Sequence, residues 1–484
     1  MKKVTAGAAI VAAGLLLPMS GSAAEVHRSL IRAAKILHVQ TVESLEFEAS
    51  GKYFQFTQAP APELPWPPFT VDGYAATLDY QRAAVHAKYH RVQVQEPGRE
   101  RPLAEATMDQ YAINGVSWNL APGPTAIPAN LAERNAEIWA SPQGFVKAAL
   151  ANHALVTTAK DGARVIFNRG KYRYEGVINS KSEVVYVRTF MDSPVLGDTP
   201  IEWRYSGYRD FDGVPFPTSI ERLVAGLPWY QLSVTAVRIN TAVPFPVPAE
   251  VAANPTPSVS GVDVTELAPG VFFFAGGTHN SVIVEQKDGV VVVEAPLNEE
   301  RSRAVMAKVR ELFPAKKIRS VINTHAHFDH AGGLRTYVAE NVTIVTQERN
   351  AAYYARAWQQ PHKLNPDRLA LAKRQPRFET FTTGMVLADD QRPIEIHSIE
   401  GSGHNDAFAL VYLPAQKILI EADAWTPAPP GATPPAVVNP LWINLYRNVE
   451  RLKLDVQRIA PLHGAVQDFA TFRAAIHLPQ RTPD

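Results

Sequence analysis

The sequence predicts two domains of different fold class, a mainly antiparallel β (α+β) domain over residues 25–240 and a layered α/β domain over residues 262–484. In the first half, strand-like runs follow one another between Gly, Pro and Asp turns. In the second half, strands alternate with helices, which indicates stacked layers of both. Between them, residues 241–261 hold five prolines without a helical or strand period, which is typical of a semi-rigid linker.

The N-terminus has the pattern of an export signal. Lys2 and Lys3 precede an apolar run over residues 4–17, and small residues follow up to Ala24. Because this run is too short to cross a bilayer comfortably, we interpret residues 1–24 as a secretory signal peptide cleaved before Glu25, with a buried first helix as the alternative. The mature protein is therefore expected in the periplasm or outside the cell, with no membrane span.

Composition excludes several functions. The chain of 484 residues is 46% apolar and 20% charged, which is enough for full hydrophobic cores. Its formal net charge of +1 gives no basic excess for binding nucleic acid, so we expect a small molecule as the partner. With no cysteine in the sequence, an exported chain has no disulfides and no thiolate ligand. Any metal site must use His, Asp and Glu.

The first half shows no catalytic cluster. A helix is expected over residues 26–37 and a helical patch over residues 128–152, among strands such as "IEWRYSGYRDF" and "YQLSVTAVRIN". This pattern predicts an antiparallel sheet with one or two helices packed on it, and it resembles the curved half-barrels of periplasmic lipoprotein carriers. The histidines of this half are scattered, and we expect surface or core roles for them: His27, His38, His86, His90 and His153.

The second half holds a concentrated histidine motif. A helix is predicted over residues 298–313, and the buried strand "IRSVINT" then leads into "HAHFDHAGG", expected as a loop. His325 and His327 lie two apart and point to the same side of an extended segment, whereas Asp329 and His330 follow a bend. Two metal ions about 3.5–4 Å apart would suit this arrangement. Further ligands are expected after later strands: His404, Asp423 and His463.

The motif "THAHFDHAGG" matches the H-x-H-x-D-H signature of the metallo-β-lactamase superfamily, and the later His, Asp and His arrive in its order. The resemblance covers about residues 261–478. It implies an αβ/βα sandwich with two divalent metal ions, most simply zinc, although iron or manganese would suit these ligands too. It further implies a set of roles: His325, His327 and His404 on the first metal, Asp329, His330 and His463 on the second, Asp423 bridging them, and Asp329 and Asp423 as the catalytic side chains.

The expected reaction is attack of a metal-bound hydroxide on the carbonyl of an ester or lactone. In this superfamily a bridging Asp is usual for thioesterases, lactonases, phosphodiesterases and nucleases, whereas zinc β-lactamases usually carry Cys or another residue there. Between Asp423 and Arg447 the sequence has no Lys, Arg or Ser, which favours an apolar substrate over an anionic one. Two alternatives stay open, a β-lactam hydrolase and a non-catalytic periplasmic binding protein for an apolar ligand.

Several residues near the motif have two interpretations. His279 and Asn280 in "FFAGGTHNS" could reach substrate or serve the turn, and Trp425 and Trp442 could be pocket walls or core residues. Residues 347–378 could form a helical lid or a packing or dimer element.

Two departures from the family pattern bear on the substrate subclass. The first sheet's turn reads "EAP" at residues 294–296 where D-T-G is common, and Glu421-Ala422 precede the aspartate where Gly is common. Both positions would support the metal ligands rather than bind metal. His362 and His397 receive no ligand role.

Overall fold

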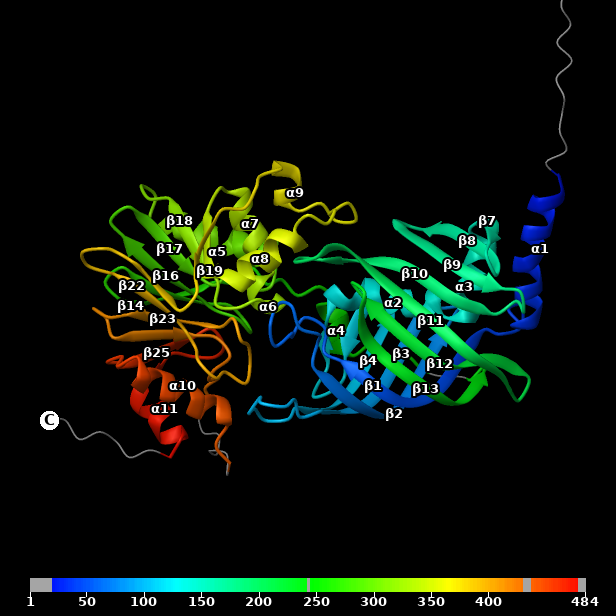
Figure 1. Ribbon diagram of the computed structural model, residues 1–484, viewed down its shortest axis with the longest axis horizontal. Coiled ribbons are helices and arrows are strands. Elements are labelled where there is room, and N and C mark those ends of the chain that lie inside the picture. The colour runs from blue at the N-terminus through cyan, green and yellow to red at the C-terminus, as the bar shows by residue number, and fades with distance from the viewer. Residues whose placement is uncertain (1–19, 242–243, 430–436, 478–484) are drawn as a thin grey trace, which may run out of the picture.

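The computed structural model describes residues 20–241, 244–429 and 437–477. Figure 1 shows two bodies side by side, an N-terminal one built on a single large sheet and a C-terminal one built on two smaller sheets. Most of the expected signal peptide, residues 1–19, lies outside the described residues, and residues 20–24 belong to the first turns of helix α1 (Ser20–Ile36). Among the helices of the described segments, none has the length and apolar character needed to cross a membrane.

The N-terminal body is a 13-stranded antiparallel sheet made of two meanders that join where β1 pairs with β13. Pairs such as Leu45 with Ile239 set the register of that junction. The sheet order is β6-β5-β4-β3-β2-β1-β13-β12-β11-β10-β9-β8-β7. Its strands are β1 (Ser44–Phe54), β2 (Pro68–Asp79), β3 (Ala84–Gln93), β4 (Glu105–Ile113), β5 (Val116–Asn119), β6 (Thr125–Ala126), β7 (Leu155–Ala159), β8 (Gly162–Arg169), β9 (Tyr172–Asn179), β10 (Val184–Ser193), β11 (Gly197–Phe211), β12 (Val214–Val224) and β13 (Leu227–Ile239).

Three α-helices pack on this sheet, one more than the one or two that the sequence predicted, because the helical patch over residues 128–152 is divided into two helices at Ser141. A short 3₁₀ turn η1 (Pro128–Asn130) leads into α2 (Leu131–Ala140) and α3 (Pro142–Ala151). Ser141 separates α2 from α3, and its side chain accepts a hydrogen bond from the amide of Gly144, the usual start of a helix. Apolar side chains of α1, α2 and α3 share one core with the strands, and the sheet curves around these helices (Figure 1).

The proline-rich segment is more ordered than a linker without structure. It contains the short helix α4 (Ala249–Ala253), whereas the sequence predicted no helix in this segment. Phe245 and Val251 are buried in a small cluster with Tyr111 and Trp118 of the N-terminal body. Burial of these two apolar side chains fixes the segment to the first sheet.

The C-terminal body has two sheets packed face to face. The first is seven-stranded, in the order β14 to β20, and the second is six-stranded, in the order β21 to β26. The first sheet comprises β14 (Asp263–Ala268), β15 (Val271–Ala275), β16 (Ser281–Gln286), β17 (Gly289–Val293), β18 (Ile318–Ile322), β19 (Thr343–Gln347) and β20 (Phe378–Phe381). The second comprises β21 (Gly384–Leu387), β22 (Ile394–Ser398), β23 (Ala409–Leu413), β24 (Ile418–Glu421), β25 (Arg458–Pro461) and β26 (Gln467–Asp468).

Helices cover both outer faces of this pair of sheets, so the predicted αβ/βα sandwich is confirmed (Figure 1). One apolar core lies between the sheets and includes the inner faces of the last two helices, and another lies between the first sheet and its helices. The helices are α5 (Glu299–Leu312), α6 (Phe328–Ala331), α7 (Leu334–Ala339), α8 (Glu348–Ala357), α9 (Arg368–Ala372), α10 (Pro440–Arg451) and α11 (Phe469–Ala475). The motif expected as a loop therefore contains a single helical turn, α6, over residues 328–331.

Hydrogen bonds and an ion pair connect the two bodies. The amide of Asp406 donates to the carbonyl of Pro60 at 2.8 Å, and the guanidinium of Arg99 forms two 2.8 Å hydrogen bonds with the Asp406 carboxylate. Residues 347–378, left open as a lid or a packing element, pack against the turn from β10 to β11. There the Asp198 carboxylate accepts hydrogen bonds from the amides of Lys363 and Leu364.

Candidate metal centre

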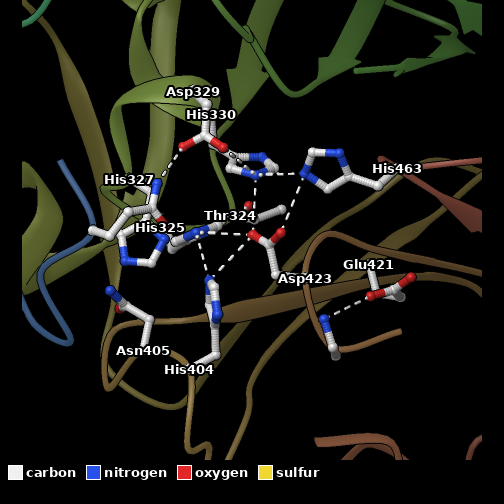
Figure 2. A network of polar contacts seen from close by, with 12 residues as sticks. Thr324, His325, His327, Asp329, His330, His404, Asn405, Glu421, Asp423 and His463 are labelled. Atoms are coloured by element: carbon white, nitrogen blue, oxygen red, sulfur yellow. Dashed lines mark hydrogen bonds and ion pairs between the residues drawn. The ribbon is translucent and has the colours of Figure 1, made fainter. Parts of the chain in front are cut away.

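All predicted ligands lie at the ends of strands along one edge of the sandwich. His325 follows β18, Asp423 follows β24 and His463 follows β25. Since β17 to β20 are parallel, and β24 is parallel to β25, the carboxyl ends of these strands meet at that edge. His404 reaches the same place from the loop after β22, and Figure 2 shows the six other predicted ligands gathered around Asp423.

Asp423 lies at the middle of the cluster. Its Oδ2 atom is 3.2 Å from His325 Nε2, 3.0 Å from His330 Nε2 and 3.2 Å from His404 Nε2. Its Oδ1 atom is 3.2 Å from His463 Nε2 (Figure 2). One carboxylate therefore touches histidines of both expected metal sites, which is the position that a bridging ligand requires.

The side chains form two four-residue groups that could each hold a cation, and a third group of three residues, Glu294, His325 and His330, overlaps both. Within each group the ligand atoms lie within 4.8 Å of one another. The first group is His325, His327, His404 and Asp423, and the second is His279, Asp329, His330 and His463. The structure thus brings together all seven residues that the sequence nominated and adds His279 to them.

Hydrogen bonds to the outer Nδ1 atoms of three histidines turn their inner Nε2 atoms toward the centre of the cluster. In each case a ring N–H that faces away from the centre meets an oxygen acceptor, which fixes the tautomer and turns the other lone pair inward. The contacts are His325 Nδ1 to Thr324 Oγ1 at 3.0 Å, His330 Nδ1 to Glu294 Oε2 at 3.1 Å and His463 Nδ1 to the Thr278 carbonyl at 2.9 Å.

His327 has the opposite tautomer. Its Nε2–H donates to the carbonyl of Ala59 at 2.9 Å, and its Nδ1 is buried without a hydrogen-bond partner. Asp423 Oδ2 is also buried, and the Nε2 atoms of three histidines converge on it. Buried lone pairs without donors are costly unless a cation meets them, so this donor set fits two divalent metal ions.

The electrostatics of the metal-free cluster agree with this fit. Burial and the neighbouring His330 lower the pKa of His325 to about 4, so its imidazole is neutral at pH 7, as a ligand must be. Although burial lowers the pKa of His330, the carboxylates of Asp423 and Asp329 raise it well above its usual range. In the metal-free protein a protonated His330 thus balances these carboxylates, a role that a cation would take over.

Glu294 supports the loop that carries the ligands, in line with the supporting role expected for the turn at residues 294–296. It is fully buried with a φ of +76°, and it follows the apolar strand β17. Its carboxylate accepts hydrogen bonds from Asn323 Nδ2 at 3.0 Å and from Thr324 Oγ1 at 2.5 Å, and it is the partner of His330 Nδ1. The glutamate thereby orients residues on both sides of His325.

Glu421 shapes the turn that carries Asp423. Its Oε2 atom accepts the amides of Ala424 and Trp425, each at 3.0 Å. Burial raises the pKa of Glu421 well above its usual range. Trp425 itself is 2% exposed and its ring packs against Phe472, so it is a core residue and not a pocket wall.

The two residues of the turn before β16, His279 and Asn280, have different roles. His279 is buried, its Nε2 lies 3.3 Å from Asp329 Oδ2, and its ring centroid is 4.3 Å from that of His463. The side-chain amide of Asn280 donates to the carbonyls of Pro461 and Gly464, so Asn280 stabilises the turn. Its neighbour His279 therefore belongs to the second metal group.

The other residues singled out in the sequence take structural places. Trp442 packs on the apolar core as a partly buried side chain. His397 pairs with Glu395 at 3.0 Å, and His362 lies 3.8 Å from Asp367, both away from the cluster.

The N-terminal body contributes to the centre through the segment between β1 and β2, which sequence analysis did not anticipate. Gln58 Nε2 donates to Asp329 Oδ1 at 3.0 Å, and the Ala59 carbonyl accepts from both His327 and the Asn405 amide. A backbone carbonyl and a single glutamine in a loop carry no pattern, so no sequence signal pointed to them.

Comparisons with known proteins agree with this geometry. Residues 275–463 match the family model of the metallo-beta-lactamase superfamily. A linear primary-alkylsulfatase from a Pseudomonas species is 38% identical over 61 residues, which are 13% of this chain and 9% of that enzyme. The chain therefore spans less than a tenth of this relative's length.

Among solved structures, the chain matches a metallo-beta-lactamase from Pontibacter korlensis, with 21% identity over 45% of this chain and 98% of that one and a TM-score of 0.36. Another is a metallo beta lactamase from Hirschia baltica, with 18% identity over 46% of this chain and 99% of that one and a TM-score of 0.34. The matched family model, together with the fold and the clustered motif, places the C-terminal half of this chain in the metallo-β-lactamase superfamily of metal-dependent hydrolases.

Proposed function

We propose that the protein is an exported hydrolase that uses two divalent metal ions, most simply zinc, to cleave an ester or lactone with an apolar substituent. The observation that carries this proposal is the position of Asp423, whose two oxygens touch histidines of both ligand groups. Closed structural sites hold one ion with four ligands, whereas this cluster offers ligands for two. The clustered ligands also disfavour a binding protein with a degenerate metal site.

The chain's own residues prepare the site for hydrolysis. Bound divalent ions would supply an activated water as nucleophile and positive charge for the oxygen that becomes negative. Burial alone would raise the pKa of the Asp329 and Asp423 carboxyls, but the histidines around them lower it, so both keep their negative charge. The Asp329 side chain is 34% exposed, so substrate and water can reach this side of the cluster.

The segment after Asp423 supports an apolar substrate. It has no cationic side chain before Arg447 that could clamp a substrate carboxylate, although its residues 430–436 lie outside the described part of the chain. Penicillin-type substrates carry such a carboxylate. For this reason we place β-lactam hydrolysis second to ester and lactone hydrolysis.

One further candidate comes from the alkylsulfatase match. That relative's name identifies hydrolysis of the sulfate ester of a linear alkyl chain, and the identity of 38% lies in a 61-residue stretch. A sulfate ester of an apolar alcohol would combine an apolar chain with a hydrolysable group that metal ions can bind, as an apolar carboxylic ester does. We therefore include an alkyl sulfate among the substrates to be tested.

The test is a substrate panel with zinc-loaded mature protein. It contains p-nitrophenyl butyrate, a γ-lactone, decyl sulfate and a chromogenic cephalosporin, each with and without a chelator. We expect chelator-sensitive cleavage of the ester or lactone, and its loss in Asp423→Ala while the melting transition is retained. The control Asp389→Ala changes an aspartate of the same body that lies outside both ligand groups and accepts the backbone amides of Lys287, Gln391 and Arg392. Cephalosporin cleavage alone, or full activity of Asp423→Ala, would overturn the proposal.

A further inference from the structure

A cavity of about 420 Å³ lies between the two bodies, beside the histidine motif. Its volume falls in the range of roughly 300–1,000 Å³ that small-molecule sites occupy. Both bodies line it, mainly with apolar side chains: Leu64, Trp66, Leu196 and Leu227 from the N-terminal body, and Phe328 and Tyr353 from the C-terminal body.

The cavity and the metal centre share one thin wall. Ala326 and Phe328 line the cavity, and they alternate along the chain with His325, His327 and Asp329. On the other side, residues 57 and 59 line the cavity and flank Gln58, which bonds Asp329. The wall therefore ends at the pair of Gln58 and Asp329, where the Asp329 side chain is 34% exposed.

The lining offers mainly apolar contact area, with Arg356 and Gln360 as polar side chains from the C-terminal body. Leu64 and Leu227 are each 37% exposed, so both side chains can contact a molecule in the cavity. Asp198 also lines the cavity, but its carboxylate already accepts the amides of Lys363 and Leu364.

An aromatic bridge fixes this wall. The Phe328 ring lies 5.5 Å from that of Phe56, which in turn lies 4.8 Å from Trp66 and 5.1 Å from Trp229. Edge-on and stacked aromatic contacts of this kind hold the two bodies in register beside the cluster. The cavity is thus a fixed feature of the junction, with a polar site at one rim.

We propose that this cavity binds the unbranched apolar chain of the substrate while the hydrolysable group lies over the rim at Asp329. This inference rests on the proposed function, and it assigns the N-terminal body a direct part in substrate selection. The substrate class is a linear amphiphile in which an ester group ends an alkyl or acyl chain.

The first test is a chain-length series of p-nitrophenyl esters, from acetate to decanoate, with the zinc-loaded full mature chain. Burying each added CH₂ should raise kcat/KM about fourfold until the cavity is filled, chiefly through a lower KM. The double variant Leu64→Asn/Leu227→Asn should flatten the series, and partial exposure of both leucines keeps the folding cost low. The matched control is Leu155→Asn, a 61% exposed leucine on β7 that does not line the cavity, and it should keep the wild-type slope.

A second measurement is independent of turnover. Calorimetric binding of n-alkan-1-ols, from butanol to decanol, should strengthen about fourfold per CH₂ in the wild type and in Leu155→Asn, but not in the double variant. Should no ester react while this binding pattern holds, the proposed reaction fails and the chain site stands. Hydrolysis without a chain-length gain, or a double variant that keeps the wild-type slope in both experiments, would overturn the inference.

Discussion

Replacing Gln58, a residue of the N-terminal body, by Ala should lower the metal affinity of the centre, although Gln58 is not itself a metal ligand. In the structure Gln58 Nε2 donates to Asp329 Oδ1 at 3.0 Å, and Asp329 belongs to the second metal group. A hydrogen bond to a charged group contributes about 1.5–3 kcal/mol, and the partial exposure of Asp329 places this one near the lower end. The expected loss is about tenfold in the affinity for one of the two ions, since about 1.4 kcal/mol corresponds to a factor of ten.

The assay is competition for zinc with a chromogenic chelator, read on the full mature chain without substrate. Gln55→Ala is the matched control, because Gln55 lies in the same segment and its backbone amide, not its side chain, makes the bond to Pro67. Both variants should keep the wild-type melting temperature in the metal-free state. Equal zinc affinity of Gln58→Ala and Gln55→Ala would refute the claim that the N-terminal body positions a metal ligand.

Further variants test the supports of the cluster and the fold. Glu294→Gln removes the charged acceptor of His330 Nδ1 and should lower zinc affinity about 10- to 100-fold in the same chelator assay; an unchanged affinity would contradict this role. His279→Ala should lower the affinity for one zinc ion and leave the affinity for the other unchanged. An equal loss for both ions would contradict the assignment of His279 to the second metal group. Asp367→Asn breaks the paired hydrogen bonds with Arg335, at 2.5 and 2.9 Å, and should cost about 2 kcal/mol of unfolding free energy at pH 7 in urea denaturation. Burial alone would raise the pKa of Asp367, but its bonds with Arg335 lower the pKa below 3.8. The stability lost in Asp367→Asn should therefore be complete above pH 5 and shrink as the pH falls through the lowered pKa.

The layered architecture was predictable because its signals are local. Helix α5 spans Glu299–Leu312, one residue shorter at each end than the predicted helix over residues 298–313. The Asn298 side chain accepts the amide of Arg301 as its N-cap, and Pro314 follows its end. The ligand cluster was predictable for a similar reason, since each of its members follows an apolar strand and the strand ends meet at one edge.

Other features depend on contacts that are remote in sequence. The role of Ala59 rests on a backbone carbonyl 268 positions from His327, and any residue there could supply it. Helix α4 was missed because prolines dominate the segment, while the burial of Val251 against the N-terminal body decides its structure. The place of His279 in the second metal group was missed because a lone histidine beside two glycines is equally typical of a turn.

The most direct test of the central claim is the metal stoichiometry that activity requires. Metal-free protein is titrated with zinc, and bound zinc and hydrolysis of the best ester are measured on the same samples. The account predicts two zinc ions per chain, with hydrolysis complete only at the second equivalent, and at most one tightly bound ion in Asp423→Ala. Full activity at one equivalent, or two tightly bound ions in Asp423→Ala, would contradict a two-metal centre bridged by Asp423.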